Sequence, residues 1–228
     1  MDKTKDIHKE FYLQALEHHP DDARRFGWMG ERYQKIRFAQ IIRLVKLTCM
    51  RAKKDPGEVT ILDFGCGDGE LFGLLHYAGI GCEYYGVDMM PEYIELAHQR
   101  AKNEPWGLSA MFECYEWDGS EPLPFSKDVD IIVESGAFSI MERPTRNKIF
   151  QALYGLPKLG FAGTFLTHNI NLARVHPTIN PLAPSEIISQ IDVHQYAYTL
   201  LFDYLPHDFA IGIYPRPIKR PEMPKKQE

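Results

Sequence analysis

The chain has 228 residues, of which 44% are hydrophobic and 25% charged, and its formal net charge is −5. These values are ordinary for a globular protein with a sizeable core, and the negative charge argues against general attraction to nucleic acid or to an anionic membrane. The N-terminus lacks the apolar core of a signal peptide, and no apolar run approaches the ~20 residues that cross a bilayer. We therefore expect a cytoplasmic monomer or homodimer with no membrane or nucleic-acid partner.

The cysteines carry no metal-binding signature. They stand at positions 49, 66, 82 and 114 without a C-x-x-C pair, and the sequence has no H-E-x-x-H or comparable cluster. This spacing predicts reduced, mainly buried thiols and no metal site. Cys66 is the one expected near a ligand, as a small residue and not as a nucleophile.

Two helices are predicted before the first strand. Apolar residues recur at helical spacing in residues 6–19 and more strongly in residues 31–50, where Ile41 and Leu44 share one face. A loop containing glycines connects the two helices. Residues 1–55 are therefore expected to form an N-terminal helical segment.

A glycine-rich turn follows. The segment ILDFGCGDGE, residues 61–70, runs from a short buried strand into a helix, with glycine at positions 65, 67 and 69. Glycine is the residue that enters such a turn without steric cost where positive φ or close backbone approach is required. The N–H groups at a helix N-terminus can contact a ligand. The segment therefore predicts a binding site at a strand-to-helix turn.

The rest of the chain alternates strands and helices. Strands are predicted at residues 83–87, from 112 towards 117, at 129–133 and at 163–167, with helices at 92–102, 146–156 and, after Ser185 as cap, 186–191, and a closing antiparallel hairpin of strands 196–204 and 209–214. Residues 171–184 are expected to form an irregular loop. Such alternation predicts an open parallel sheet with helices on both faces and right-handed crossovers.

Ligands of such sheets bind at the carboxyl ends of the strands. That edge would gather the glycine turn and the residues that follow the strands, which are Asp88, Trp117, Asp118, Glu134, Ser135, His168 and Asn169. This edge is therefore the predicted binding site.

The glycine spacing distinguishes between cofactors. A dinucleotide fingerprint, G-x-G-x-x-G, would have its third glycine at position 70, where this chain has Glu70; its own third glycine is Gly69. With Asp63 before the first glycine and Asp88 closing the next strand, the pattern resembles motif I and the following acidic motif of class I S-adenosylmethionine (SAM) dependent methyltransferases. The alternative is a sheet that binds NAD or a nucleotide sugar.

The resemblance extends from about Tyr33 to Tyr214. WDGSEPLPFSKDVDIIVESGAF resembles the family's region around the fourth strand, and DYLPHDFAIGIYP resembles its closing hairpin. The implied fold is α/β: a seven-stranded Rossmann-like methyltransferase sheet, mostly parallel with an antiparallel last strand, with helices on both faces and an N-terminal helical lid. Residues 1–55 would be the lid, 56–214 the SAM-binding domain and 215–228 a flexible tail rich in proline and lysine.

The resemblance also implies roles at a cofactor site. The backbone at Gly65, Cys66 and Gly67 would let SAM approach the turn, with the Asp63 carboxylate near its ammonium group. Asp88 would accept hydrogen bonds from both ribose hydroxyls, because a carboxylate has two acceptor oxygens suited to a vicinal diol. The other expected cofactor contacts are Met89 and Asp118 at the adenine, Trp117 as an apolar neighbour, Glu134 near the methionine moiety and Arg37 at the methionine carboxylate.

Several of these residues have a plain structural alternative. Asp118 could cap a turn, Glu134 could be a solvated charge at a strand end, and Arg37 could be a surface arginine on an amphipathic helix. His168 is predicted as a catalytic base or, alternatively, as a histidine bonded to a neighbouring loop.

The implied reaction is an in-line displacement at a sulfonium methyl group, which requires donor and acceptor to be aligned in a dry pocket. A base such as His168 is needed only where the nucleophile must first lose a proton. The predicted substrate-binding residues are Trp28, Tyr33, Tyr115 and Asn169.

The acceptor is predicted to be a small molecule with an O, N or S nucleophile. After the fourth strand the chain reads ESGAF, and not the N-P-P-Y-like motif of many family members that methylate exocyclic amines of bases or glutamine. Two rivals stay open. One is a SAM enzyme that releases methylthioadenosine by cyclisation or aminocarboxypropyl transfer, and the other is a non-catalytic partner protein that keeps the fold.

Overall fold

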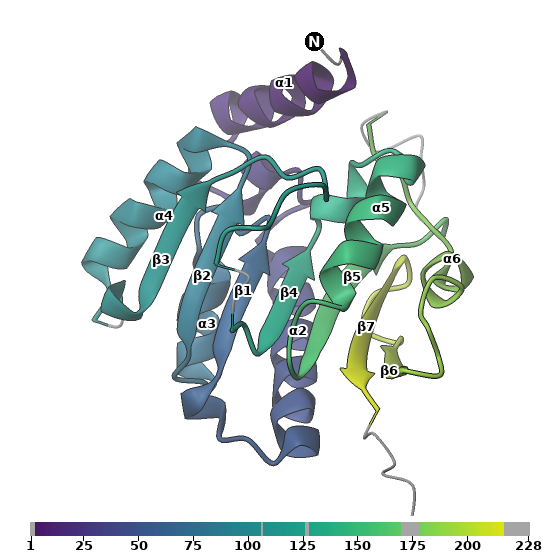
Figure 1. The fold of residues 1–228 in the computed structure, drawn as a ribbon. Helices are drawn as coiled ribbons and strands as arrows, with labels where there is room; N and C mark the ends of the chain where they lie inside the picture. Colours follow the sequence, from purple (N-terminus) through teal and green to yellow (C-terminus); the bar gives the residue numbers. More distant parts are fainter. Residues whose placement is uncertain (1–2, 106, 126–127, 170–177, 217–228) are drawn as a thin grey trace, which may run out of the picture.

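The computed structural model describes residues 3–105, 107–125, 128–169 and 178–216. Its helices, 3-10 helices and strands (Figure 1) are α1 (Lys3–His18), η1 (Ala23–Phe26), α2 (Glu31–Ala52), η2 (Pro56–Glu58), β1 (Thr60–Phe64), α3 (Glu70–Tyr77), β2 (Glu83–Asp88), α4 (Pro91–Asn103), η3 (Gly107–Ser109), β3 (Ala110–Cys114), β4 (Ile131–Ser135), η4 (Ala137–Ser139), α5 (Arg143–Tyr154), β5 (Gly160–Leu166), α6 (Pro184–Ile188), β6 (Tyr196–Leu201) and β7 (Asp208–Pro215).

Seven strands form one sheet in the order β3-β2-β1-β4-β5-β7-β6. The β1–β2, β2–β3, β1–β4 and β4–β5 pairs are parallel, whereas β7 runs antiparallel to both of its neighbours. The strand order reverses between β1 and β4, which is where open α/β sheets bind their ligands. The predicted fold, a mostly parallel sheet with an antiparallel last strand, is confirmed.

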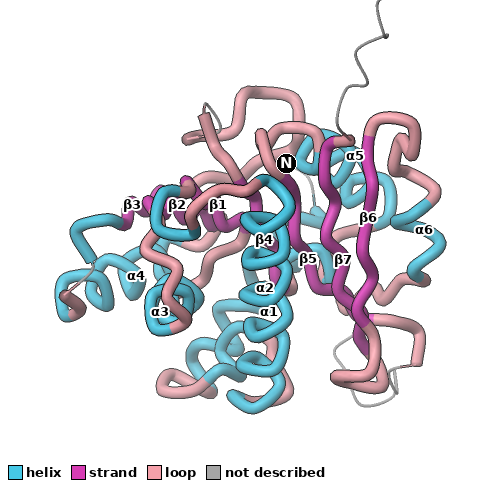
Figure 2. Tube along the Cα trace, turned by 90° about the horizontal axis from the view of Figure 1, so that it is seen from below, coloured by secondary structure: helices cyan, strands magenta, loops and turns pink. Residues whose placement is uncertain are grey.

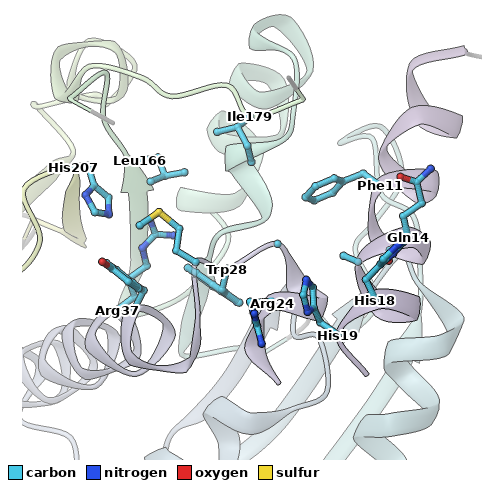
Figure 3. A pocket seen from close by; sticks show the side chains of 14 residues that line it. Phe11, Gln14, His18, His19, Arg24, Trp28, Arg37, Leu166, Ile179 and His207 are labelled. Atoms are coloured by element: carbon cyan, nitrogen blue, oxygen red, sulfur yellow. The ribbon is translucent and has the colours of Figure 1, made fainter. Parts of the chain in front are cut away.

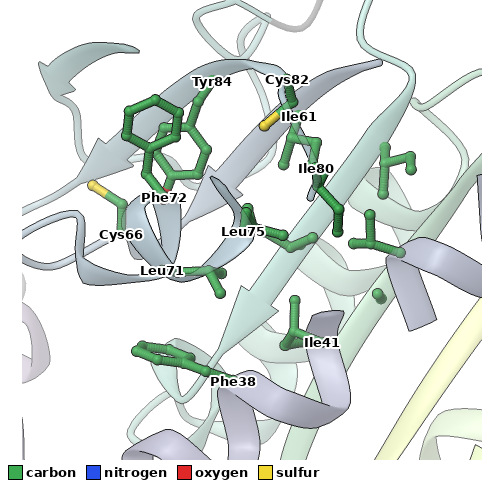
Figure 4. Packing of buried hydrophobic residues seen from close by; sticks show 14 of the residues in the cluster. Phe38, Ile41, Ile61, Cys66, Leu71, Phe72, Leu75, Ile80, Cys82 and Tyr84 are labelled. Atoms are coloured by element: carbon green, nitrogen blue, oxygen red, sulfur yellow. The ribbon is translucent and has the colours of Figure 1, made fainter. Parts of the chain in front are cut away.

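Both faces of the sheet are covered, which explains why its strands are apolar almost throughout. Ile61 of β1 packs in a cluster with α2, α3 and α4, whereas Leu62 packs in an opposite cluster with α5 and α6. Figure 2 shows α2, α3 and α4 on one side of the strands and α5 on the other. In the first cluster Phe38 of α2 lies near Leu71 of α3 (Figure 4).

The N-terminal helices lie at the edge where the parallel strands end. α1 crosses above that edge in Figure 1, beyond the carboxyl ends of β1, β2 and β4. α2 packs on the sheet through side chains such as Ile41 and Leu44, both fully buried. The Tyr93 hydroxyl of α4 donates to Arg25 O of η1. The helical segment thus covers the predicted binding edge.

Most predicted boundaries differ from the structure by a few residues, as three examples show. β3 ends at Cys114 because its partner β2 ends at Asp88, so residues 115–118 continue as a loop. β5 starts at Gly160, three residues earlier than predicted. α6 starts at Pro184 with Ala183 as its N-cap, so Ser185 lies inside the first turn.

Two predicted segments lie partly outside the described residues: the loop 171–184, of which 171–177 are not described, and the tail 215–228, of which 217–228 are not described. Within the described ranges, no helix has the length and apolar character needed to cross a membrane.

Candidate cofactor and acceptor site

The glycine turn closes against the end of β2. Gly65 N donates to Val87 O at 2.8 Å, and Gly67 N donates to Asp88 Oδ2 at 2.9 Å. Gly65 and Gly67 have φ of 78° and 55°, and a Cβ on Gly65 would lie 2.6 Å from that of Ala137. The turn therefore requires glycine for both its backbone conformation and its space.

Asp88 has a half-buried carboxylate fixed by backbone groups. Oδ1 accepts from Met90 N at 3.0 Å, and Oδ2 accepts from Gly67 N. Each oxygen keeps a further lone pair, so the carboxylate can still accept from a diol. Burial raises the pKa of Asp88 to about 6, although these backbone donors act in the opposite direction.

Asp63 lies on β1, the strand that precedes the glycine turn. It is 3% exposed and accepts a hydrogen bond from the Tyr84 hydroxyl. Burial raises the pKa of Asp63 to about 7, and the bond from Tyr84 lowers it. A buried carboxylate with a raised pKa is stabilised in its charged form by a cation placed beside it. Its chemistry therefore fits the ammonium group of SAM.

Glu134 is fully buried at the end of β4, so the alternative of a solvated strand-end charge is wrong. Oε1 accepts from Phe138 N at 3.2 Å, whereas Oε2 has no hydrogen-bond partner among the described residues. Burial raises the pKa of Glu134 to about 8. Glu134 is not among the residues that line the two cavities described below, and the predicted contact through its carbonyl stays a prediction.

Arg37 is 4% exposed, so the alternative of a surface arginine is wrong as well. Its guanidinium bonds both carboxylate oxygens of buried Asp208, with Nη2 and Oδ1 2.5 Å apart, and lies 4.6 Å from the ring centre of Trp28. Two of its nitrogens are thus already engaged by the protein. A bond from Arg37 to the cofactor carboxylate stays a prediction.

A cavity of about 140 Å³ opens at the glycine turn, and we call it the strand-end cavity. Side chains of α1, η1 and α4 close it, among them Phe11, Tyr12, Phe26 and Tyr93. The predicted site residues that line it are Trp28, Arg37, Asp63, Gly65, Cys66, Gly67, Asp88, Met89, Tyr115 and Trp117.

A second cavity of about 400 Å³ lies between α1, η1 and α2, and we call it the N-terminal cavity (Figure 3). Tyr33, a predicted substrate-binding residue, lines it. The two cavities adjoin, because they share Phe11, Gly27, Trp28, Arg37, Leu166 and Ile179.

Asp118 lies outside both cavities and matches its structural alternative. Its carboxylate is exposed and accepts hydrogen bonds from Ser120 N at 2.9 Å and from the Ser120 hydroxyl. These two bonds cap the turn after Trp117. Trp117 itself is buried and donates from Nε1 to Glu121 O at 2.6 Å. β3 ends at Cys114, and the loop that follows lines the strand-end cavity up to Trp117 but not at Asp118.

His168 and Asn169 also lie outside both cavities. The His168 side chain is 60% exposed, with Nε2 3.6 Å from Glu186 Oε1, and Asn169 Nδ2 donates to Pro206 O at 3.4 Å. Both line a separate hollow beside the β6–β7 hairpin. The structure therefore does not bring the predicted base to the binding edge.

Asp68 is a structural residue of the turn that the sequence did not reveal. Its carboxylate, 3% exposed, pairs with Arg25 of η1 at 2.6 Å and with Arg100 of α4. The acid between two glycines is visible in the sequence, but its partners stand 43 and 32 residues away. Asp68 thus ties the N-terminal segment to the glycine turn.

Gln34 was also not predicted. It lines the strand-end cavity, is 3% exposed, and its Oε1 has no partner among the described residues. Buried acceptors are normally hydrogen-bonded. An unpaired acceptor in the strand-end cavity fits a ligand that carries N–H donors, as SAM does.

Residues 61–160 match the family model described as a methyltransferase domain. No curated protein matches the chain at a significant level. Among solved structures, the chain is similar to magnesium protoporphyrin IX methyltransferase (ChlM) from Synechocystis PCC 6803 with bound SAM, with 12% identity, coverage of 95% of this chain and 99% of that chain, and a TM-score of 0.69. The same enzyme with bound SAH is also similar, with a TM-score of 0.66.

Other solved structures cover less of the chain. The small RNA methyltransferase HEN1 shares 16% identity over 77% of this chain and 25% of that chain, with a TM-score of 0.59. The CcbJ methyltransferase from Streptomyces caelestis shares 12% identity over 69% of this chain and 89% of that chain, with a TM-score of 0.55. Likeness at this level of identity establishes the fold.

The glycine turn, the strand-end acid and the sheet order define a Rossmann-like domain of the methyltransferase type. With the family match over residues 61–160, they support a class I SAM-dependent methyltransferase. The cofactor of that class is S-adenosyl-L-methionine, and the residues of the strand-end cavity fit that molecule.

Proposed function

We propose that this methyltransferase transfers a methyl group to a small molecule bound in the N-terminal cavity. The observation that carries the proposal is the junction of the two cavities at Trp28 and Arg37. A volume of about 400 Å³ lies within the range of ~300–1,000 Å³ that ligand pockets occupy. An acceptor there would lie next to whatever fills the strand-end cavity.

The protein's own residues would mainly bind and orient the reactants. Asp88 would hold the ribose, and Asp63 would balance the charge of the ammonium group. When bound, SAM supplies a methyl group on a positively charged sulfur. Alignment and exclusion of water suffice for such a displacement, so we propose no proton-transfer role for His168.

The N-terminal helices would act as a lid. The strand-end cavity, at about 140 Å³, is smaller than ordinary ligand pockets of ~300 Å³ or more. Phe11 and Tyr12 of α1 are among the residues that narrow it. We propose that α1 shifts outward when SAM enters and then closes over both ligands.

The acceptor class can be tested by following products. The protein is incubated with SAM and, separately, with low-molecular-weight metabolites or with short RNA at low salt, and S-adenosylhomocysteine and methylthioadenosine are measured by mass spectrometry. We expect S-adenosylhomocysteine to form with the small molecules. Turnover with RNA alone would overturn the small-molecule assignment, and methylthioadenosine would indicate another use of SAM.

The lid is tested by deleting residues 1–30. We expect the shortened protein to keep its affinity for SAM, because the glycine turn and Asp88 remain, and to lose turnover with the acceptor. Intact turnover would contradict the lid.

A further inference from the structure

The N-terminal cavity has an unusual charge pattern for this chain. The sequence as a whole has 31 Asp and Glu against 26 Lys and Arg. None of the described residues that line the cavity is Asp or Glu, whereas its polar lining consists of Gln14, His18, His19, Arg24, Tyr33, Arg37 and His207. The cavity therefore offers mainly hydrogen-bond donors and groups that can become cationic.

The polar groups form two ends. Figure 3 shows His18, His19 and Arg24 at one end and Arg37 and His207 at the other. Because Arg37 also lines the strand-end cavity, its end is the one near the cofactor. The end at Arg24 is the remote one, where a group that does not react would be recognised.

Asp22 is the counter-ion of Arg24 and bonds only part of its guanidinium group. Asp22 accepts from Arg24 Nε at 2.8 Å and from Arg24 Nη2. The Arg24 side chain is 53% exposed, and these bonds leave its Nη1 edge for a ligand. Asp22 also lies within electrostatic reach of His19.

His18 adds a directional donor or acceptor. Its Nδ1 lies 2.7 Å from Gln14 O, and since a carbonyl only accepts, Nδ1 carries the proton. The other ring nitrogen, Nε2, then accepts a hydrogen bond in neutral histidine and donates one in the protonated form.

Apolar side chains line much of the rest of the cavity. They are Phe11, Trp28, Met29, Leu166 and Ile179. Such a lining fits a flat aromatic or apolar body. In the described part of the chain no group of three or more His, Cys, Asp or Glu is placed to hold a metal ion.

We propose that the acceptor is an amphipathic anion: an aromatic or apolar body that carries a carboxylate or phosphate, bound with the anionic group at Arg24 and His18. This inference rests on the proposed function, and it deepens it by naming the substrate class. The nucleophile lies at the opposite end of the molecule, towards Trp28 and Arg37.

The test uses three matched probes, 2-naphthoate, 2-naphthyl phosphate and the neutral 2-naphthamide, titrated by NMR against the full-length protein saturated with S-adenosylhomocysteine. We expect at least one anion to bind about fivefold or more tighter than the amide. A preference for phosphate over carboxylate would identify the anionic group as phosphate, and the reverse would identify a carboxylate.

Arg24→Gln should remove most of the preference for the anion and leave the affinity for 2-naphthamide unchanged. Arg43→Gln, an exposed arginine of α2 that lines neither cavity, is the matched control and should change neither affinity. Equal binding of anion and amide, binding of none of the probes, or an unchanged preference in Arg24→Gln would overturn the proposal. Failure of S-adenosylhomocysteine itself to bind would count against the cofactor site instead, and the probes can then be titrated without it.

Discussion

The two cavities differ in how the chain builds them. The strand-end cavity is formed largely by consecutive strand ends that bond one another, as Gly67 and Asp88 do. The N-terminal cavity is assembled from α1, α2 and residues as distant as Leu166 and Ile179. The first follows from the sheet topology, and the second from contacts between distant segments. Many residues of the strand-end cavity could therefore be predicted from the sequence, whereas only Trp28, Tyr33 and Arg37 of the N-terminal cavity were predicted.

The largest effect is expected where the two cavities meet. Asp208→Ala should lower the free energy of unfolding by about 3–5 kcal/mol, because it leaves the buried Arg37 guanidinium without its counter-ion. Urea denaturation measures the change. The double variant Arg37→Met/Asp208→Ala is the control and should recover part of the loss; a loss below about 1 kcal/mol in Asp208→Ala would contradict a structural role for the pair.

Gly65→Ala tests the rigidity of the strand-end cavity. We expect a loss of about 2–4 kcal/mol in unfolding free energy, since the new Cβ combines positive φ with overlap on Ala137. Gly79 has nearly the same φ, 79°, but a Cβ added there would meet no atom within 4 Å, so Gly79→Ala is the matched control. It should lose only about 1–2 kcal/mol. Equal losses in the two variants would show that Ala137 moves aside.

Glu134 makes the stability of the strand-end side depend on pH. Its pKa in the folded protein is about 8, above its ordinary value of 4.5, so the folded state binds the proton more tightly. Its contribution to stability therefore falls as pH rises from about 4.5 to about 8 and is constant above that.

Glu134→Gln should remove this pH dependence. The free energy of unfolding of the variant, taken relative to that of the unchanged protein, should rise by about 1–3 kcal/mol from pH 5 to pH 8. Denaturation at both pH values measures it. Glu58→Gln, at an exposed glutamate, serves as control. If the difference in unfolding free energy between variant and parent were the same at both pH values, Glu134 would not be a buried carboxyl with a raised pKa.

Asp118→Ala should have the smallest effect. Its carboxylate caps an exposed turn and lines neither cavity, so the dissociation constant for SAM should change by less than about twofold. A loss of tenfold or more would restore the predicted contact with the adenine amine, and would mean that the loop closes onto the cofactor.

The sequence predicted the sheet and most of the cofactor side for a physical reason. Parallel strands place their carboxyl ends at one edge, so a glycine turn and a strand-end acid such as Asp88 come together whatever the rest of the chain does. Trp117 lines the strand-end cavity and Asp118 does not, because the end of β3 depends on how far its partner β2 extends.

The acceptor side depends on contacts between distant segments, which leave no periodic signal. His168 follows β5 at the expected edge, yet Thr167 N donates to His207 O and Asn169 Nδ2 donates to Pro206 O, so the chain there packs against the hairpin. The pairing of Arg37 with Asp208 spans 171 residues. Such pairings follow from the assembled fold and from no local pattern.

The most direct test of the account is the affinity of Asp88→Ala for SAM, measured by calorimetry beside the unchanged protein. The account predicts a loss of about 1.5–3 kcal/mol, or roughly 10- to 150-fold in dissociation constant, because the carboxylate would no longer accept from the ribose hydroxyls. An unchanged dissociation constant would contradict the assignment of the strand-end cavity as the cofactor site.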